Sequence, residues 1–243
     1  MLLRLNKYLA QCGLGSRRKT EDLITNGRIK INGIVVKKLG SIIDTDVDSL
    51  LLDDKPISLL ERKYYIILNK PRGYITTSSD EKDRMTVMQL IPEKYLNAGV
   101  FPVGRLDKDT EGLLLFTNDG DISYKLNHPS FEISKEYFIE LDKALVDEDK
   151  SKIEKGIFLH QLKLKLKRCI IKYADLSHTR VTMKISEGKK RQIRYTFKNF
   201  GYKVTKLKRI GYGPLILKGV NRGDIKVLKE GEVKRLKELV YIK

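Results

Sequence analysis

Two carboxylates stand close together in residues 104–120, a segment rich in charged and small residues that leads into an apolar run. They are Asp107 and Asp109, and Thr110 follows them directly. Carboxylates act in enzymes as nucleophiles or as general bases. Asp and Thr also satisfy free backbone N–H groups in turns, and for an isolated short pattern the turn is the commoner explanation. The segment is a candidate active site, to be weighed against the rest of the chain.

The sequence lacks the patterns that bind metal ions. Residues 44–49 space three Asp like the start of a calcium loop, but Ser49 and Lys55 occupy the positions where such a loop needs Gly and Glu. The three histidines and the two cysteines stand in no ligand spacing. We therefore predict neither a metal site nor a disulfide framework.

Positive charge is concentrated in the last third of the chain. The 243 residues have a net charge of +18, and residues 155–243 contain 25 Lys and Arg against 6 Asp and Glu. This asymmetry indicates a polyanionic partner, and nucleic acid is favoured over a membrane because no basic amphipathic helix with an aromatic apolar face stands out. A lysine-rich, solvated surface explains the charge equally well.

Composition is typical of a folded, globular protein, with 41% hydrophobic and 33% charged residues. The apolar runs are far shorter than the roughly 18 residues of a membrane span, and charge interrupts the first residues too early for a secretory leader. We expect a cytoplasmic protein with no membrane partner.

Residues 1–60 predict one small domain of helices and hairpins. Apolar spacing predicts helices over residues 3–14 and 17–26, with Ser16 as the N-cap of the second. Asn32-Gly33 between residues 28–31 and 34–37 predicts a hairpin with a type I′ turn. A second strand pair and the domain boundary are expected within residues 44–63.

Residues 61–243 predict a larger α+β domain with a mixed sheet. Expected strands are at residues 64–68, 113–117, 136–141, 163–171 and 179–185, and a helix is expected over residues 191–200.

Four blocks of sequence carry a family resemblance. In chain order they read LNKPRGY (residues 68–74), GRLDKDTEGLLL (104–115), KEY (135–137) and EGKKRQIR (187–194). Together they resemble the pseudouridine synthases that modify ribosomal RNA, in particular the RsuA/RluB type. Residues 1–60 resemble the small RNA-binding domain first described in ribosomal protein S-four. The resemblance implies a small N-terminal α/β RNA-binding domain followed by a mixed-sheet catalytic domain of the pseudouridine synthase type.

The resemblance also implies an activity, the isomerisation of uridine to pseudouridine in ribosomal RNA, and we favour the large subunit. Enzymes of this family detach uracil from its ribose, rotate it and rejoin it through carbon-5, without a cofactor. Asp107 would be the essential carboxylate, acting as nucleophile or as base.

Other site residues follow from the resemblance in the same way. Arg194 would keep Asp107 ionised by placing a guanidinium beside it. Tyr137 would stack on the target base and help to move the carbon-5 proton, and Ile193 would pack beneath the pocket. Further substrate-binding residues are expected to be basic: Arg105, Lys135, Arg191 and Lys198.

The target uridine has to leave its stack to be reached, so RNA binding is half of the expected function. The partner would be ribosomal RNA or an assembly intermediate that contains it, and we expect a monomer. In the N-terminal domain, the basic residues that surround the two helices are the candidate RNA contacts: Arg4, Lys7, Arg17, Arg18, Lys19 and Arg28.

Two alternatives remain. A non-catalytic RNA-binding or ribosome-assembly factor on the same scaffold would explain the charge and the N-terminal domain, and only Asp107, Tyr137 and Arg194 argue against it. A hydrolase with Asp107 and Asp109 as paired carboxylates is weaker, because we do not expect the two side chains to face the same side.

Overall fold

A computed structural model describes residues 1–60, 62–159 and 163–241 of the chain. The chain is divided into two compact units. The first consists of Met1–Tyr64, Pro92–Phe101 and Thr117–Gly120, and the second of Tyr65–Ile91, Pro102–Phe116 and Asp121–Lys243. The first unit thus takes in two later segments besides the expected N-terminal domain, and the division at residue 60 stays a prediction.

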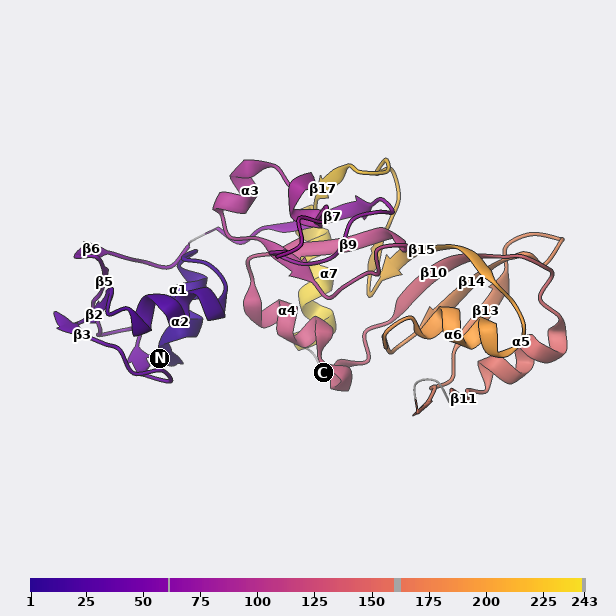
Figure 1. Ribbon diagram of the computed structural model, residues 1–243, viewed down its shortest axis with the longest axis horizontal. Coiled ribbons are helices and arrows are strands. Elements are labelled where there is room, and N and C mark those ends of the chain that lie inside the picture. The colour runs from indigo at the N-terminus through magenta and orange to yellow at the C-terminus, as the bar shows by residue number, and fades with distance from the viewer. Residues whose placement is uncertain (61, 160–162, 242–243) are drawn as a thin grey trace. The chain divides into compact units, whose positions relative to one another are not determined.

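Residues 1–60 form two short helices and two small sheets (Figure 1). In chain order the elements are β1 (Leu2–Arg4), α1 (Leu5–Gln11), α2 (Arg17–Thr25), β2 (Ile29–Ile31), β3 (Ile34–Val35), β4 (Ile42–Asp44), β5 (Leu50–Leu52) and β6 (Lys55–Pro56). Asn32 and Gly33 have positive φ angles of 49° and 82°, so the predicted hairpin turn between β2 and β3 is present.

The first predicted helix begins later than expected. Leu3 pairs with Ile43 of β4 in an antiparallel ladder, so residues 2–4 form a strand and the helix starts at Leu5. Ser16 caps α2 as predicted, because its hydroxyl accepts a hydrogen bond from the backbone N–H of Lys19 at 3.2 Å.

The apolar side chains of α1 and α2 meet those of the small sheets in one core. Its buried members all come from residues 5–50: Leu5, Tyr8, Leu9, Cys12, Ile24, Ile29, Ile43 and Leu50. Among the residues that the structure describes, the members of this core all come from residues 3–57.

A mixed nine-stranded sheet organises the second unit, among the residues that the structure describes. The order β13-β14-β10-β15-β9-β7-β17 is extended by β16 beside β15 and β8 beside β9. Their bounds are β7 (Tyr65–Lys70), β8 (Phe101–Val103), β9 (Glu111–Thr117), β10 (Lys135–Leu141), β13 (Ile170–Tyr173), β14 (Arg180–Ile185), β15 (Val204–Tyr212), β16 (Leu215–Ile216) and β17 (Ile225–Val227). β15 and β9 are parallel, whereas β10 is antiparallel to both of its neighbours.

The remaining elements, from residue 87 on, are not part of this sheet. They are η1 (Val87–Leu90), α3 (Glu93–Asn97), α4 (Gly120–Asn127), η2 (Pro129–Phe131), α5 (Asp147–Glu154), β11 (Phe158–Leu159), β12 (Leu164–Lys165), α6 (Gln192–Asn199) and α7 (Glu230–Tyr241). The strand expected over residues 163–171 is wrong in its extent, because only the short strands β12 and β13 form there, with β12 paired to β11 instead of to the large sheet.

The core of the second unit lies between β7, β9 and two helices. Leu113 and Leu115 of β9 pack in one cluster with side chains of α4 and with Leu236 and Val240 of α7. Every residue of β7 and β9 is buried, which explains why both strands read as continuous apolar runs instead of alternating patterns. In the described ranges, no helix is both long enough and apolar enough to cross a membrane.

Candidate active site

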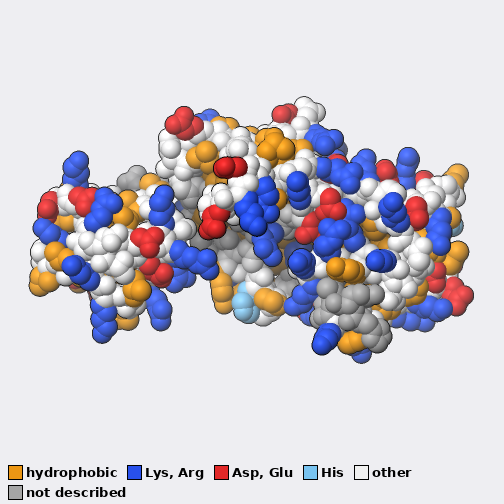
Figure 2. Space-filling view, in the orientation of Figure 1, with side chains coloured by type: hydrophobic (Ala, Val, Ile, Leu, Met, Phe, Trp, Pro, Cys, Tyr) orange, Lys and Arg blue, Asp and Glu red, His pale blue; other side chains and the backbone are white. Residues whose placement is uncertain are grey.

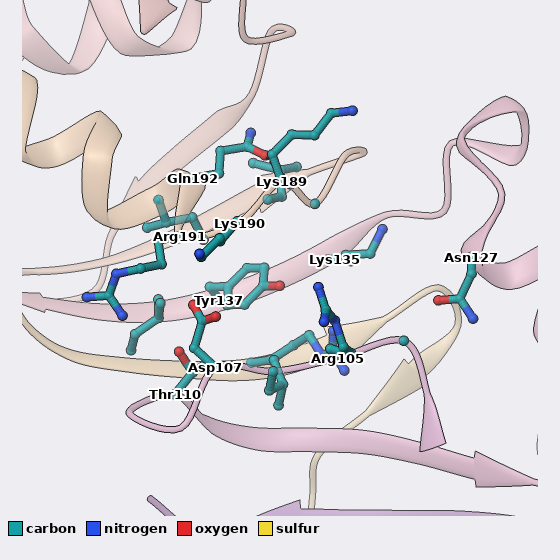
Figure 3. A pocket seen from close by; sticks show the side chains of 17 residues that line it. Arg105, Asp107, Thr110, Asn127, Lys135, Tyr137, Lys189, Lys190, Arg191 and Gln192 are labelled. Atoms are coloured by element: carbon teal, nitrogen blue, oxygen red, sulfur yellow. Dashed lines mark hydrogen bonds between the residues drawn. The ribbon is translucent and has the colours of Figure 1, made fainter. Parts of the chain in front are cut away.

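Asp107 lies in the connection between β8 and β9, at the edge of a cavity of about 280 Å³ (Figure 3). Its backbone carbonyl accepts a hydrogen bond from Thr110 N–H at 3.0 Å, which closes a turn. The cavity is lined by Gly104, Arg105, Leu106, Asp107, Thr110, Asn127, Lys135, Tyr137, Ile185, Gly188, Lys189, Lys190, Arg191, Gln192, Ile193, Leu207 and Arg209. The segment that the sequence singled out therefore faces a cavity that could receive a ligand.

Lys70, the last residue of β7, stabilises the turn that contains Asp107. Its fully buried ammonium donates hydrogen bonds to the carbonyls of Pro71, Asp107 and Thr110 at 3.0, 3.2 and 2.9 Å. Burial lowers the pKa of Lys70 to about 8, against the opposing effect of the nearby carboxylates, of which Asp109 is the largest. Lys70 stands in the block of residues 68–74, for which the resemblance implied no residue role.

A second anchor of the same loop is Thr76. Its hydroxyl donates to the carbonyl of Leu106 at 2.9 Å and accepts from the N–H of Leu106 at 3.2 Å. Backbone groups next to Asp107 are thus held from two sides, and the position of its carboxylate is set by buried polar contacts.

Tyr137 and Lys135 reach the cavity from β10. Residues two apart on a strand share a face, and both side chains line the cavity. Tyr137 is 7% exposed, and Figure 3 shows its ring between the Asp107 carboxylate and Lys135. Asp107 and Tyr137, which are distant in sequence, therefore meet at one site, as the resemblance implied.

Arg194 does not pair with Asp107 as expected. Its Nε lies 3.3 Å from Oδ2 of Asp109, and its terminal nitrogens donate to the carbonyls of Asp109 and Val204 at 3.1 and 3.0 Å. Across residues 1–60, 62–159 and 163–241, the Asp107 carboxylate has no hydrogen bond or ion pair. Arg194 also does not line the cavity. The charge of Asp107 acts on the Arg194 guanidinium without a direct bond between them, and Arg194 holds the loop through its neighbour Asp109.

Asp109 faces a second guanidinium as well. Nη1 of Arg191 lies 3.2 Å from both of its carboxylate oxygens. Burial lowers the pKa of Arg194, and the negative charge of Asp109 is the main opposing effect. Asp109 is therefore a structural counter-ion and does not line the cavity beside Asp107, which removes the paired-carboxylate arrangement that a hydrolase would need.

The remaining expected substrate contacts divide into two groups. Arg105, Arg191 and Ile193 line the cavity, whereas Lys198 is exposed and does not. Arg191 precedes the first turn of α6 and has a positive φ of 51°, so the helix expected over residues 191–200 begins one residue later.

Sequence reasoning missed Arg209. This residue is 2% exposed on β15, opposite Tyr137 in the strand register, and it lines the cavity. Its Nε donates to the carbonyl of Leu113 at 2.7 Å. The signal in the sequence was its spacing of two from the buried Leu207, which places an arginine at an inward-facing strand position.

The basic residues expected to bind RNA in the N-terminal domain lie at or near its surface. Arg4, Arg17, Arg18, Lys19 and Arg28 are exposed, and Lys7 is half-buried. Arg28 forms an ion pair with Asp53, which raises the pKa of the guanidinium. Its charge is therefore already partly balanced within the domain. Figure 2 shows further Lys and Arg side chains gathered over the part of the second unit where β10 and β15 lie.

Comparison with known proteins matches both parts of the chain to families. Residues 64–199 match the model of the RNA pseudouridylate synthase family, and residues 3–48 match the S4 domain. A ribosomal large subunit pseudouridine synthase B of Bacillus subtilis is 39% identical over 238 residues, which cover 97% of this chain and 96% of that protein. An RNA pseudouridine synthase of Aquifex aeolicus is 38% identical over 100% of this chain and 97% of its own length.

A solved structure agrees with the fold. The crystal structure of a pseudouridylate synthase superposes with a TM-score of 0.70 at 29% identity, covering 96% of this chain and 99% of that one. The α+β fold with a small N-terminal RNA-binding domain and a pseudouridine synthase domain is thereby confirmed. The chain is an enzyme that isomerises uridine to pseudouridine, and it belongs to the RNA pseudouridylate synthase family.

Proposed function

We propose that this protein isomerises a specific uridine of large-subunit ribosomal RNA to pseudouridine, with Asp107 as the essential carboxylate. The printed name of the Bacillus relative supports the choice of RNA. The observation that carries the choice of residue is the meeting of Asp107 and Tyr137 at one cavity, where Asp107 is the carboxylate among the lining residues.

The reaction needs a carboxylate, a shaped pocket and a group that helps to move the C5 proton. The bond between uracil N1 and ribose C1′ breaks, a bond between C5 and C1′ forms, C5 loses a proton and N1 gains one. Atoms and electrons balance without an oxidant or a cofactor. Asp107 attacks the sugar or the base, or removes a proton from the ribose, and either role requires the ionised form.

The surrounding residues have separate roles in this proposal. Tyr137 stacks on the uracil and helps to move the C5 proton, while Ile193 packs beneath it. Arg194 positions the catalytic loop through Asp109 and does not touch the substrate. Arg105, Lys135 and Arg191 bind RNA at the cavity, and Lys198 contacts phosphate outside it.

Residues 1–60 supply additional RNA affinity through Arg4, Lys7, Arg17, Arg18 and Lys19, and more weakly through Arg28. We further propose that the enzyme acts as a cytoplasmic monomer on ribosomal RNA or on an assembly intermediate. A protein that binds RNA without catalysis is the competing function, and the cavity shared by Asp107 and Tyr137 favours the enzyme.

Mapping of pseudouridine in the RNA of both ribosomal subunits, from cells with and without this protein, tests the proposal. We expect one or a few positions of the large-subunit RNA to lose the modification, and the purified protein to restore it on the unmodified transcript. Loss confined to the small subunit would overturn the choice of RNA. An unchanged map together with an inactive purified protein would favour the assembly factor.

A further inference from the structure

Two cations lie close together at the wall of the cavity. Lys135 of β10 and Arg209 of β15 both line it. The Lys135 ammonium and the Arg209 guanidinium lie 5.7 and 5.0 Å from the ring centre of Tyr212. In the described ranges, neither side chain forms an ion pair. Their strands are neighbours in the sheet, so their separation is set by β-pairing and not by a flexible loop.

Arg209 has unused hydrogen-bonding capacity. Nε is bound to the carbonyl of Leu113, but Nη2 is buried and has no partner among the residues described. A buried donor without a partner has lost its hydrogen bonds to water without compensation, and this loss is greater where the group is charged. An unpartnered guanidinium nitrogen on a residue 2% exposed, at the wall of a cavity, points to a ligand that brings an acceptor.

Lys135 is in a similar state. Its ammonium donates to the carbonyl of Ile133 at 3.1 Å, and Glu187, the carboxylate that favours its charge, is hydrogen-bonded to Gln192 instead. Burial, and then the neighbouring Arg209, lower the pKa of Lys135 to about 8. Two positive charges that repel each other at a cavity wall are stabilised by an anion placed between them.

The position of Asp107 limits what that anion can be. Its carboxylate lines the same cavity, so a negative group is repelled from its end and attracted to the end of Lys135. Figure 3 shows the Tyr137 ring between the two. A ligand that satisfies both ends has a neutral, planar part against Tyr137 and an anionic part at the two cations. A uridine nucleotide has both parts, its base and its phosphate.

We propose that Lys135 and Arg209 form a phosphate subsite that binds a phosphate attached to the target uridine while its base lies against Tyr137. This inference rests on the proposed function, and it adds Arg209 to the substrate-binding residues. The subsite holds the nucleotide in the cavity after it has left the RNA stack, because a charge-assisted hydrogen bond from a buried guanidinium resists exchange with water.

Binding of uridine and of 5′- and 3′-uridine monophosphate to the full-length protein tests the subsite. The measurement is calorimetric titration at pH 7.5 and low salt, where the phosphate of either nucleotide is mostly dianionic. We expect the wild-type protein to bind at least one of the nucleotides about tenfold more tightly than uridine, as one charge-assisted hydrogen bond would provide. Equal affinity for all three would overturn the proposal.

Variants assign the phosphate preference to the two side chains. Arg209→Gln and Lys135→Gln should each lose most of the preference for the nucleotide while uridine affinity changes by less than about threefold. Lys208→Gln is the matched control, because it removes one positive charge from the next position of β15, outside the cavity. A preference that persists in both variants, or that is equally lost in Lys208→Gln, would overturn the subsite.

Two further outcomes have a definite meaning. If the variants lose uridine affinity as strongly as nucleotide affinity, the cations recognise the base and the phosphate subsite is wrong. Arg209 is buried, so its variant is compared with wild type by thermal unfolding, and Lys135→Gln decides the test if Arg209→Gln does not fold. The proposed function is tested separately, by turnover on ribosomal RNA. If turnover is absent, the proposed function is wrong, but a measured preference for the phosphate would still stand.

Discussion

Asp107 and Asp109 are two residues apart and have opposite surroundings. Asp109 lies between the guanidinium groups of Arg191 and Arg194, whereas the Asp107 carboxylate faces the cavity. A carboxylate held by two cations is bound in its charged form and is poorly available to a substrate. The turn that Lys70 supports thus places the two carboxylates in different surroundings.

Asp107→Asn should abolish pseudouridine formation, a loss of at least about 10²–10⁴-fold. The change removes the charge and the nucleophile but almost no volume, so folding and RNA affinity should be retained. Single-turnover assays and RNA binding measure both. Asp83→Asn, at an exposed position with a positive φ of 49° that Asn tolerates, is the control and should behave as wild type. Retained turnover in Asp107→Asn would remove it from the reaction.

Arg194→Lys should slow turnover by about a hundredfold, which corresponds to about 3 kcal/mol in the activation free energy. Lysine keeps the charge but cannot reach Asp109 and the carbonyl of Val204 at once, so the loop loses its anchor. Because Arg194 acts through the loop, kcat should fall while RNA affinity is unchanged. Arg235→Lys on the exposed surface of α7 is the matched control. A loss of affinity with normal kcat would identify Arg194 as a phosphate contact instead.

Lys70 should make stability depend on pH in the alkaline range. Its pKa is about 8 in the folded protein and about 10.4 in an unfolded chain. Between these values the unfolded chain holds a proton that the folded protein has lost, so the contribution of Lys70 to the free energy of unfolding rises with pH. Urea unfolding at pH 7.5, 9 and 10 should show that the free energy of unfolding of the wild type increases with pH relative to that of Lys70→Met. A constant difference between the two proteins would contradict the lowered pKa.

At the scale of elements, the contact between β9 and β15 assembles the site. The two strands are parallel, with Gly112 opposite Arg209, and this pairing brings the guanidinium of Arg209 beside the strand that follows Asp107. Gly112 has a φ of 104°, and a Cβ atom there would lie 2.2 Å from the carbonyl oxygen of Arg209. Only glycine permits this close approach.

Gly112→Ala should therefore lower the free energy of unfolding by about 2–6 kcal/mol through backbone strain and steric overlap. It should also lower turnover, since the strand that follows Asp107 has to shift. Gly120→Ala is the matched control, because no atom lies within 4 Å of the added Cβ, and its effect should stay within about 0.5 kcal/mol. Thermal and urea unfolding compare the two. If Gly112→Ala and Gly120→Ala were equally stable, β9 and β15 could move apart to accept the Cβ atom at no cost in free energy.

At the scale of the whole molecule, two hydrophobic clusters among the described residues are built from separate parts of the chain. One draws its buried residues from positions 5–50 and the other from positions 65–240. Hydrophobic burial is the main driving force of folding, so a part with its own core can fold by itself. RNA affinity and catalysis are then separable properties of the two parts.

A chain of residues 62–243 should fold and keep its cavity but bind ribosomal RNA more weakly. It lacks the basic residues of the first 60 positions while retaining every member of the larger core. Circular dichroism reports folding, and filter binding at fixed salt reports affinity. Unchanged affinity would remove residues 1–60 from RNA binding. An insoluble product would show that the predicted division at residue 60 cuts through one folding unit.

Local patterns in the sequence were enough to determine much of the molecule. The hairpin at Asn32-Gly33, the cap at Ser16, the buried strand after Asp107 and the helix after Arg191 depend mainly on neighbouring residues, and each is found in the structure. The four motif blocks identified the family because their order and spacing extend over more than a hundred residues. Such features can be predicted from the order of residues along the chain.

Tertiary structure alone decided the hydrogen-bond partners of two arginines near the site. Arg194 bonds to the backbone of Asp109 across 85 positions, and Arg209 bonds to that of Leu113 across 96, and no local pattern specifies either partner. Leu3 and Arg4, expected to begin a helix, form a strand with Leu2 because β4, some forty positions later, pairs with them. Electrostatic and packing energies depend on distances in space, and the folded sheet sets those distances.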